Sequence, residues 1–195
     1  MQHLITYAGI CLRIVMPIGY YTLEVRKEGF VVGYSNIVVY SGVETQVTVI
    51  CPELKENEMR VVLTWGDKPS DLDSHLLLKY NDGETAHIFY ANSVYYEQYS
   101  DRVYNLDVDD TTQYGPETMT FYIDSPNVDE YKYYVYNYSG GNSGEELSYS
   151  GARVTVYYGT QKPKEYYVPF AQSGRTWNVF SVIDGEVVVN NTISQ

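Results

Sequence analysis

Short runs of alternating apolar and polar residues, separated by turn residues, recur along the whole chain. In the N-terminal part this pattern predicts four strands, at residues 10–15, 20–26, 34–40 and 45–50. Because residues two apart in a strand share a face, Tyr21, Leu23 and Val25 are predicted to lie on one face of the second strand. Residues 52–58 are charged and lack periodicity, which is typical of a linker.

The C-terminal part shows the same pattern and is predicted to contain nine or ten strands. They are expected at residues 59–65, 72–80, 86–90, 106–110, 118–123, 131–138, 152–158, 165–169, 177–183 and 186–190. The turn residues Asn81-Asp82-Gly83 predict a hairpin between the second and third of these strands. Residues 92–104 are polar and aromatic and are predicted to form a long loop, and residues 139–144 a glycine- and serine-rich one.

Composition supports the strand prediction. The chain contains 23 Tyr residues against five Phe and two Trp, and Tyr, Val, Thr and Ile suit a pleated, half-buried surface. Trp65 and Trp177 lie in alternating strands and are predicted to be core residues. The predicted fold class is therefore all-β, with one β-sandwich module at residues 1–53 and another at residues 59–195. The second is expected to be a jelly-roll or immunoglobulin-like sandwich of about nine strands.

The net charge of −12 belongs almost wholly to the second module. Up to Glu53 the basic and acidic residues number 3 and 4, and from Leu54 onward they number 10 and 21. A negative field of this size repels phosphate backbones and anionic lipid surfaces, so neither a nucleic-acid partner nor membrane binding is expected. The acidic residues suit a divalent cation, and they also keep a Tyr-rich surface soluble.

Cys11 and Cys51 both fall in the first module and lack the spacing of a zinc ribbon or a redox pair. They can be two buried thiols, or one disulfide that closes a loop of about 41 residues. Residues 4–19 are apolar, but Arg13 interrupts them and no basic n-region or cleavage site is present. The run is also too short to span a bilayer. The chain is therefore expected to be a fragment that does not contain its signal peptide.

Two acidic strands of the second module form the candidate site. In the first, Asp71, Asp73 and His75 are predicted to project from one face. In the second, at residues 106–110, the same alternation places Asp107 and Asp109 together. The loop Tyr114-Gly115-Pro116-Glu117 follows directly and adds a further carboxylate to the candidate metal ligands.

Paired carboxylates on one face repel each other, and a bound cation removes this penalty. Carboxylate oxygens are the ligands that Ca²⁺ prefers, so Ca²⁺ is the expected ion. If His75 is a ligand, Mn²⁺ or Zn²⁺ becomes the better candidate, and otherwise the imidazole lies outside the ligand shell. The alternative is that these Asp residues only cap turns and accept hydrogen bonds from backbone amides.

Residues 17–30 read Pro-Ile-Gly-Tyr-Tyr-Thr-Leu-Glu-Val-Arg-Lys-Glu-Gly-Phe, and a strand and Ser41-Gly-Val-Glu-Thr45 follow. This part of the chain resembles the second half of a carboxypeptidase regulatory-like domain, a transthyretin-like β-sandwich. The resemblance implies a rigid spacer or accessory module without catalytic residues. The opening strands of a complete domain are missing, so the first module is expected to be incomplete.

The second module contains Leu63-Thr-Trp65, Asp71-Leu-Asp-Ser-His75, Leu106-Asp-Val-Asp-Asp-Thr111 and Tyr114-Gly-Pro-Glu117, in this order. With the Tyr-rich strand at residues 131–138, these motifs are similar to an uncharacterised bacterial domain of the YfaP-like type. The resemblance implies a module of a multi-domain surface or secreted protein with no established activity. The matching positions are Asp71, Asp73, His75, Asp107, Asp109, Gly115, Pro116 and Glu117. The role of the acidic residues and His75 among them as metal ligands is inferred from their chemistry alone.

The function expected first is a non-catalytic structural or adhesive module of a bacterial cell-surface or secreted protein, made rigid by a divalent cation. Its partners would be neighbouring domains of the same protein, and its location extracellular or at the cell surface. The alternative is a carbohydrate- or peptide-binding module that uses exposed Tyr residues beside the acidic loops. A hydrolase is disfavoured, since no Ser/His/Asp arrangement and no Gly-x-Ser-x-Gly motif is present, and no enzyme is expected.

Overall fold

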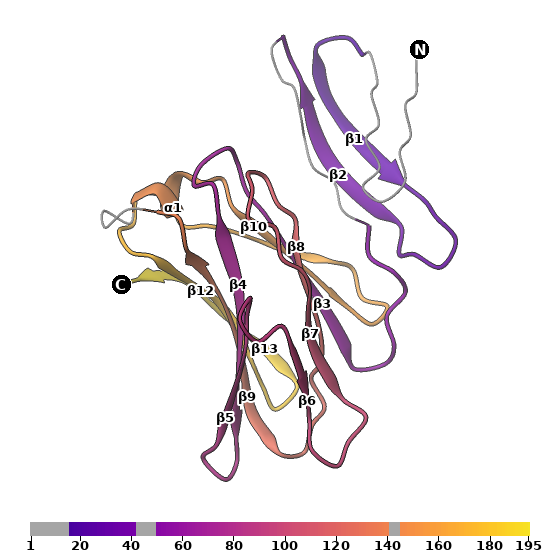
Figure 1. Cartoon of the computed structure of the whole chain (residues 1–195). Coiled ribbons are helices and arrows are strands. Elements are labelled where there is room, and N and C mark those ends of the chain that lie inside the picture. The colour runs from indigo at the N-terminus through magenta and orange to yellow at the C-terminus, as the bar shows by residue number, and fades with distance from the viewer. Residues whose placement is uncertain (1–15, 42–49, 141–144) are drawn as a thin grey trace. The chain divides into compact units, whose positions relative to one another are not determined.

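The computed structural model describes residues 16–41, 50–140 and 145–195. The chain divides into two compact units, Met1–Ile50 and Cys51–Gln195 (Figure 1). The predicted linker, residues 52–58, begins just after this division. Two predicted strands, residues 10–15 and most of 45–50, lie outside the described residues.

The described part of the first unit is an antiparallel pair of strands, β1 (Gly19–Val25) and β2 (Gly33–Val39). Tyr21, Leu23 and Val25 are half-buried, whereas the residues between them are exposed. The predicted face of this strand is therefore confirmed. Both strands lie within one residue of their predicted positions, because the alternation and the turn at Gly29 together define the hairpin.

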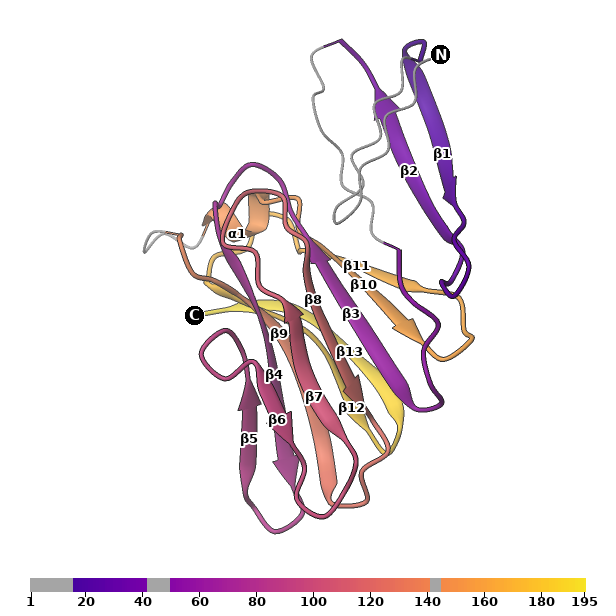
Figure 2. The same ribbon diagram turned by 45° about the vertical axis from the view of Figure 1, so that its right-hand side comes forward.

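The second unit is a sandwich of two antiparallel sheets (Figures 1 and 2). The six-stranded sheet has the order β11-β10-β3-β8-β7-β6. Its strands are β3 (Glu58–Thr64), β6 (Val94–Tyr96), β7 (Val103–Val108), β8 (Glu117–Tyr122), β10 (Arg153–Tyr158) and β11 (Lys164–Tyr167). The five-stranded sheet has the order β13-β12-β9-β4-β5. Its strands are β4 (Leu72–Tyr80), β5 (Thr85–Ile88), β9 (Val128–Asn137), β12 (Thr176–Ile183) and β13 (Glu186–Ser194).

The core of this unit lies between the two sheets and is formed by alternate residues of the central strands. Leu63 and Met119 from the first sheet and Leu76, Tyr133 and Trp177 from the second are almost fully buried. Trp65 is buried as well, so the prediction that both tryptophans belong to the core is confirmed. Burial of such apolar side chains is the main stabilising contribution to a sandwich of this kind. The all-β fold class is confirmed.

The largest difference from the predicted strands falls in residues 92–104. This segment was predicted to be a loop, but it contains β6 and the beginning of β7. Tyr104 is fully buried and Tyr95 packs against the core, while Tyr96 is exposed. The alternation was hidden because Tyr occupies both the buried and the exposed positions. A second difference is a helix, α1 (Glu145–Tyr149), whose Leu147 is buried.

Cys51 is a free, buried thiol at the start of the second unit, and Cys11 lies outside the described residues. The thiol donates a hydrogen bond to the carbonyl of Pro52, with 3.2 Å between sulfur and oxygen. Among the described residues, no helix is long and apolar enough to cross a membrane.

Candidate functional site

The candidate site lies where the first half of β4 has a free edge. β5 pairs with β4 only from Leu76 to Lys79, so among the described strands the preceding residues of β4 pair with β9 alone. A buried backbone N–H on such an edge needs an acceptor. Glu117, the first residue of β8, supplies it, since its Oε2 accepts a hydrogen bond of 2.5 Å from the N–H of Ser74.

Glu117 is held inside the sandwich by the register of its own sheet. It lies opposite Leu63 of β3, whose side chain belongs to the core, and its own side chain is fully buried. Its second oxygen, Oε1, is buried and has no hydrogen-bond partner among the described residues. A buried carboxylate oxygen without a partner is costly. The site therefore has unused capacity to bind a donor or a cation.

Asp73 and Asp109 form a cluster with Glu117. One carboxylate oxygen from each of Asp73, Asp109 and Glu117 lies within 4.8 Å of the other two. Asp73 is 3% exposed, and its Oδ2 has no hydrogen-bond partner in the described part of the chain. Asp109 is exposed, so the cluster is open to solvent on its side. We call these three residues the acidic cluster.

Asp71 lies at the edge of the acidic cluster, just before β4. Its backbone is fixed by Ser139, whose Oγ accepts from the Asp71 N–H at 2.9 Å. Its own carboxylate contains a third buried oxygen, Oδ1, that lacks a partner among the described residues. Burial, followed by the charges of Asp109 and Asp110, raises the pKa of Asp71. Asp71 therefore senses the charge of Asp109, but it is not among the three residues whose carboxylate oxygens lie within 4.8 Å of one another.

The pKa values follow from this crowding. Burial is the main cause that raises the pKa of Glu117 to about 9; the hydrogen bonds from Ser74 oppose the rise, and Asp109 and Asp73 add to it. Burial, with Asp71 and Asp109, raises the pKa of Asp73 to about 7. Without a cation, the cluster therefore retains protons at neutral pH.

The spacing of the oxygens fits one hard cation. Two oxygens bound to the same Ca²⁺, each at about 2.3–2.6 Å, are separated by at most about 5 Å. The separations within the acidic cluster lie within this limit. Among the described residues, no Lys or Arg forms an ion pair with Asp71, Asp73, Asp109 or Glu117. A divalent cation would supply the missing positive charge.

Asp107, the remaining predicted carboxylate ligand, is placed elsewhere. A register shift between Leu106 and Val108 marks a bulge in β7, and a bulge inserts one residue that changes which face the following side chains occupy. Asp107 pairs with Arg60 at 3.2 Å and accepts a hydrogen bond from Thr120. The prediction that Asp107 and Asp109 share a face therefore does not hold, and Asp107 lies outside the acidic cluster.

His75 lies beside the cluster in a stack of rings. Its Nε2 is 3.9 Å from Oδ2 of Asp73 and has no hydrogen-bond partner among the described residues. Its Nδ1 shares a hydrogen bond of 2.9 Å with Nε2 of His87, and its ring stacks on that of Tyr134 at 4.7 Å. Burial and His87 lower the pKa of His75 to about 3. The imidazole is neutral at pH 7 and does not offset the carboxylates.

His87 and Tyr134 are the partners of His75 that the sequence patterns did not identify. The signal was present in the hairpin turn at residues 81–83, because the turn fixes the register and places His87 opposite Leu77. Tyr134 is directly opposite His75 in β9. Pairing the predicted strands residue by residue would have brought the three rings together.

The glycine of the Tyr114-Gly-Pro-Glu117 motif has a packing role. Gly115 has φ = +74°, and a Cβ added to it would lie 2.7 Å from Cζ3 of Trp65. The backbone of Trp65 also donates to the carbonyl of Tyr114 at 3.3 Å. The loop is thus fixed against the end of β3, and this contact positions Glu117 as the next strand begins.

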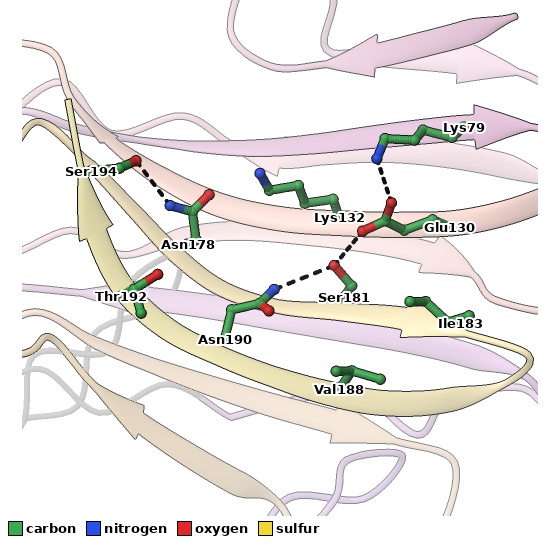
Figure 3. A pocket seen from close by; sticks show the side chains of 10 residues that line it. All are labelled: Lys79, Glu130, Lys132, Asn178, Ser181, Ile183, Val188, Asn190, Thr192 and Ser194. Atoms are coloured by element: carbon green, nitrogen blue, oxygen red, sulfur yellow. Dashed lines mark hydrogen bonds and ion pairs between the residues drawn. The ribbon is translucent and has the colours of Figure 1, made fainter. Parts of the chain in front are cut away.

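A second candidate is an open groove of about 500 Å³ on the outer face of the five-stranded sheet (Figure 3). It is lined by Lys79, Glu130, Lys132, Asn178, Ser181, Ile183, Val188, Asn190, Thr192 and Ser194. Most of its polar groups bond one another, as the chain from Lys79 through Glu130 to Ser181 shows. Its polar groups are therefore largely satisfied, unlike those of the acidic cluster.

Comparisons with known proteins support the fold alone. No protein-family model matches the chain, and no curated protein matches its sequence. The solved structure of unknown function protein SAV2460 is similar, with a TM-score of 0.50 and 13% sequence identity. The similarity covers 70% of this chain and 88% of that one. The resemblances to the carboxypeptidase regulatory-like and YfaP-like families stay predictions.

Proposed function

We propose that the second unit is a non-catalytic structural module whose two sheets are joined by a divalent cation, with Ca²⁺ as the first candidate. Asp73, Asp109 and Glu117 are the proposed ligands, and Asp71 is the proposed fourth donor. The observation that supports this proposal is the set of buried carboxylate oxygens that have no partner among the described residues. Buried carboxylates are unfavourable in the ionised form unless a ligand offsets their charge, so without a cation they retain protons.

A cation at this position would connect the two sheets. Asp73 belongs to β4 of the five-stranded sheet, and Glu117 begins β8 of the six-stranded sheet. Binding to the folded state alone stabilises it by about 2.7 kcal/mol when the free ion is at a hundred times its Kd. For a protein of this size, that gain corresponds to a rise in Tm of about 5 to 10 °C.

The wider setting of the module is also part of the proposal. The motif resemblances favour a multi-domain bacterial surface or secreted protein, in which this unit acts as a spacer or adhesive element between neighbouring domains. A Ca²⁺-dependent module suits such a location, because extracellular modules bind Ca²⁺ at about 10⁻⁴ to 10⁻³ M. The first unit would then be an accessory element of the same scaffold.

Thermal melting of the whole chain tests the cation site. Relative to EDTA, added Ca²⁺ should raise the Tm, and Mg²⁺, Mn²⁺ and Zn²⁺ serve as the comparison. Asp109→Asn should remove most of the rise. Asp107→Asn is the matched control, because Asp107 pairs with Arg60 outside the cluster, and it should retain the rise.

The identity of the best ion assigns the role of His75. If Mn²⁺ or Zn²⁺ stabilises more than Ca²⁺, and His75→Gln abolishes that preference, the imidazole Nε2 is a ligand. If the Ca²⁺ effect persists in His75→Gln, the histidine only packs beside the site. A Tm that no divalent cation changes would refute the proposed function.

A further inference from the structure

Exposed tyrosines lie next to the acidic cluster. Tyr90, in the loop after β5, and Tyr138, directly after β9, are 46% and 52% exposed. Their rings nevertheless pack edge to face, with 5.6 Å between centroids. Tyr90 also packs edge to face on Phe89 at 5.1 Å. The two exposed rings are therefore held in a defined arrangement.

This aromatic pair belongs to the same side of the sheet as Asp73. Tyr136 lies directly opposite Asp73 in the β4–β9 register, and directly opposite side chains in a sheet project from the same face. The pKa of the Tyr90 hydroxyl is raised by partial desolvation, then by Tyr138 and by the charge of Asp73. Tyr138 follows Tyr136 by two residues, and the N–H of Ser139, the next residue, donates to the carbonyl of Asp71 at 3.4 Å. The exposed rings therefore lie at the start of β4, where Asp73 is located.

The backbone under these rings is also fixed. The guanidinium of Arg175 donates from Nη2 to the carbonyl of Asn137 at 2.6 Å and to that of Tyr138 at 2.9 Å. The same guanidinium lies over the ring of Tyr136, with 4.9 Å from Cζ to the centroid. A preorganised aromatic surface loses little conformational entropy when a ligand binds.

We propose that this aromatic surface and the acidic cluster together bind a neutral saccharide, with the cation as the link between protein and sugar. This inference rests on the proposed cation site. Tyr90 and Tyr138 would pack against the apolar C–H face of a sugar ring. Two neighbouring hydroxyls of the sugar would complete the coordination of the cation on the exposed side of Asp109.

The coordination number and the charge both favour such a ligand. Ca²⁺ takes six to eight oxygens. Asp73, Asp109 and Glu117 supply six only if all three bind through both oxygens, and Oε2 of Glu117 already accepts from the N–H of Ser74. Asp71 would add one or two oxygens, which still leaves room for further ligands. Neutral hydroxyl oxygens can fill the remaining positions on the open side. The acidic surface of the chain, with a net charge of −12, disfavours an anionic sugar.

The test measures binding of the whole chain to a panel of neutral oligosaccharides of glucose, mannose, galactose and xylose, in Ca²⁺ and in EDTA. We expect at least one sugar to bind in Ca²⁺, and we expect this binding to be lost in EDTA. Tyr90→Ala and Tyr138→Ala should each weaken it about tenfold, while retaining the Ca²⁺-dependent rise in Tm. Tyr96→Ala is the matched control. Tyr96 is an exposed tyrosine of β6 that lies opposite Val103, the first residue of β7, whereas Asp109 follows the last residue of β7.

The outcomes separate this inference from the proposed function. If no sugar of the panel binds while Ca²⁺ still raises the Tm, the saccharide site is refuted and the structural cation site is retained. Sugar binding that persists in EDTA, or that Tyr90→Ala and Tyr138→Ala do not weaken, overturns the inference as well. Absence of any effect of cations on Tm refutes the proposed function, and the saccharide site with it.

Discussion

The carboxylate of Glu117 accepts a hydrogen bond from the backbone N–H of Ser74, so an acidic residue of one sheet completes the hydrogen bonding of a strand in the other. This contact explains why a carboxylate can be fully buried at the end of β8. Its second oxygen is buried without a hydrogen-bond partner among the described residues, and the carboxylate lies within 4.8 Å of those of Asp73 and Asp109. Glu117 thus has a structural role through one oxygen and a proposed ligand role through the other.

The two roles of Glu117 can be separated by substitution. Glu117→Gln keeps an acceptor for Ser74 and, like the protonated carboxyl, is neutral, so the Tm in EDTA should be unchanged or higher. The rise with Ca²⁺ should be lost, because the amide cannot ionise to bind the ion. Glu117→Ala leaves the buried N–H of Ser74 without its acceptor, which costs about 1–3 kcal/mol. Its Tm in EDTA should therefore fall by about 3 to 10 °C. Equal melting of the Ala and Gln variants would contradict the structural role.

Much of the fold and part of the site could be predicted from alternation alone. Period-two patterning placed Asp73 and His75 on one side of β4, and the structure brings Nε2 and Oδ2 of these residues to 3.9 Å. The bulge after Leu106 could not be predicted, because no Gly or Pro marks it, and it moved Asp107 away from Asp109. Alternation also does not reveal which residues of two sheets meet, so the contact from Ser74 to Glu117 required the structure.

Gly115 should not tolerate a side chain. Its positive φ disfavours any L-residue, and a Cβ would lie 2.7 Å from a ring carbon of the buried Trp65. Gly115→Ala should therefore destabilise the unit by about 2–3 kcal/mol, and the Tm should fall by about 5 to 10 °C. Calorimetry measures the loss, and a shift in Trp fluorescence reports the displaced indole. Gly83→Ala is the control, because Gly83 also has positive φ but nothing lies within 4 Å of its added Cβ.

Cys51 should react slowly in the folded protein. Its side chain is fully buried, and burial raises the pKa of the thiol to about 11. Arg60 opposes this rise, and Glu58 and Asp107 add to it. Because the thiolate is the reactive form, iodoacetamide at pH 8 should modify Cys51 at well under a hundredth of its rate in urea. Peptide mass spectrometry measures both rates. Modification at similar rates in both conditions would show that the thiol is accessible.

Without a cation, the acidic cluster should make the folded state less stable as the pH rises, and a bound cation should reduce this dependence. The pKa of Glu117 is raised from 4.5 to about 9 and that of Asp73 from 3.8 to about 7. The folded state therefore binds more protons than the unfolded state above pH 4, and these two groups destabilise the fold as the pH rises towards 9. Each extra proton held by the folded state contributes a slope of about −1.4 kcal/mol per pH unit.

The interval from pH 7 to 8.5 suits this measurement, because His75, with a pKa of 6.5 unfolded and about 3 folded, titrates mostly below it. Cys51, with a pKa of 9.0 unfolded and about 11 folded, titrates mostly above it. In EDTA the Tm should fall by about 5 °C over this interval. In Ca²⁺ it should fall less, because the ion displaces the protons and binds more tightly as the pH rises. Glu117→Gln should flatten the decline in EDTA. A Tm in EDTA that stays constant or rises from pH 7 to 8.5 in the unsubstituted chain would show that the carboxyls do not retain their protons.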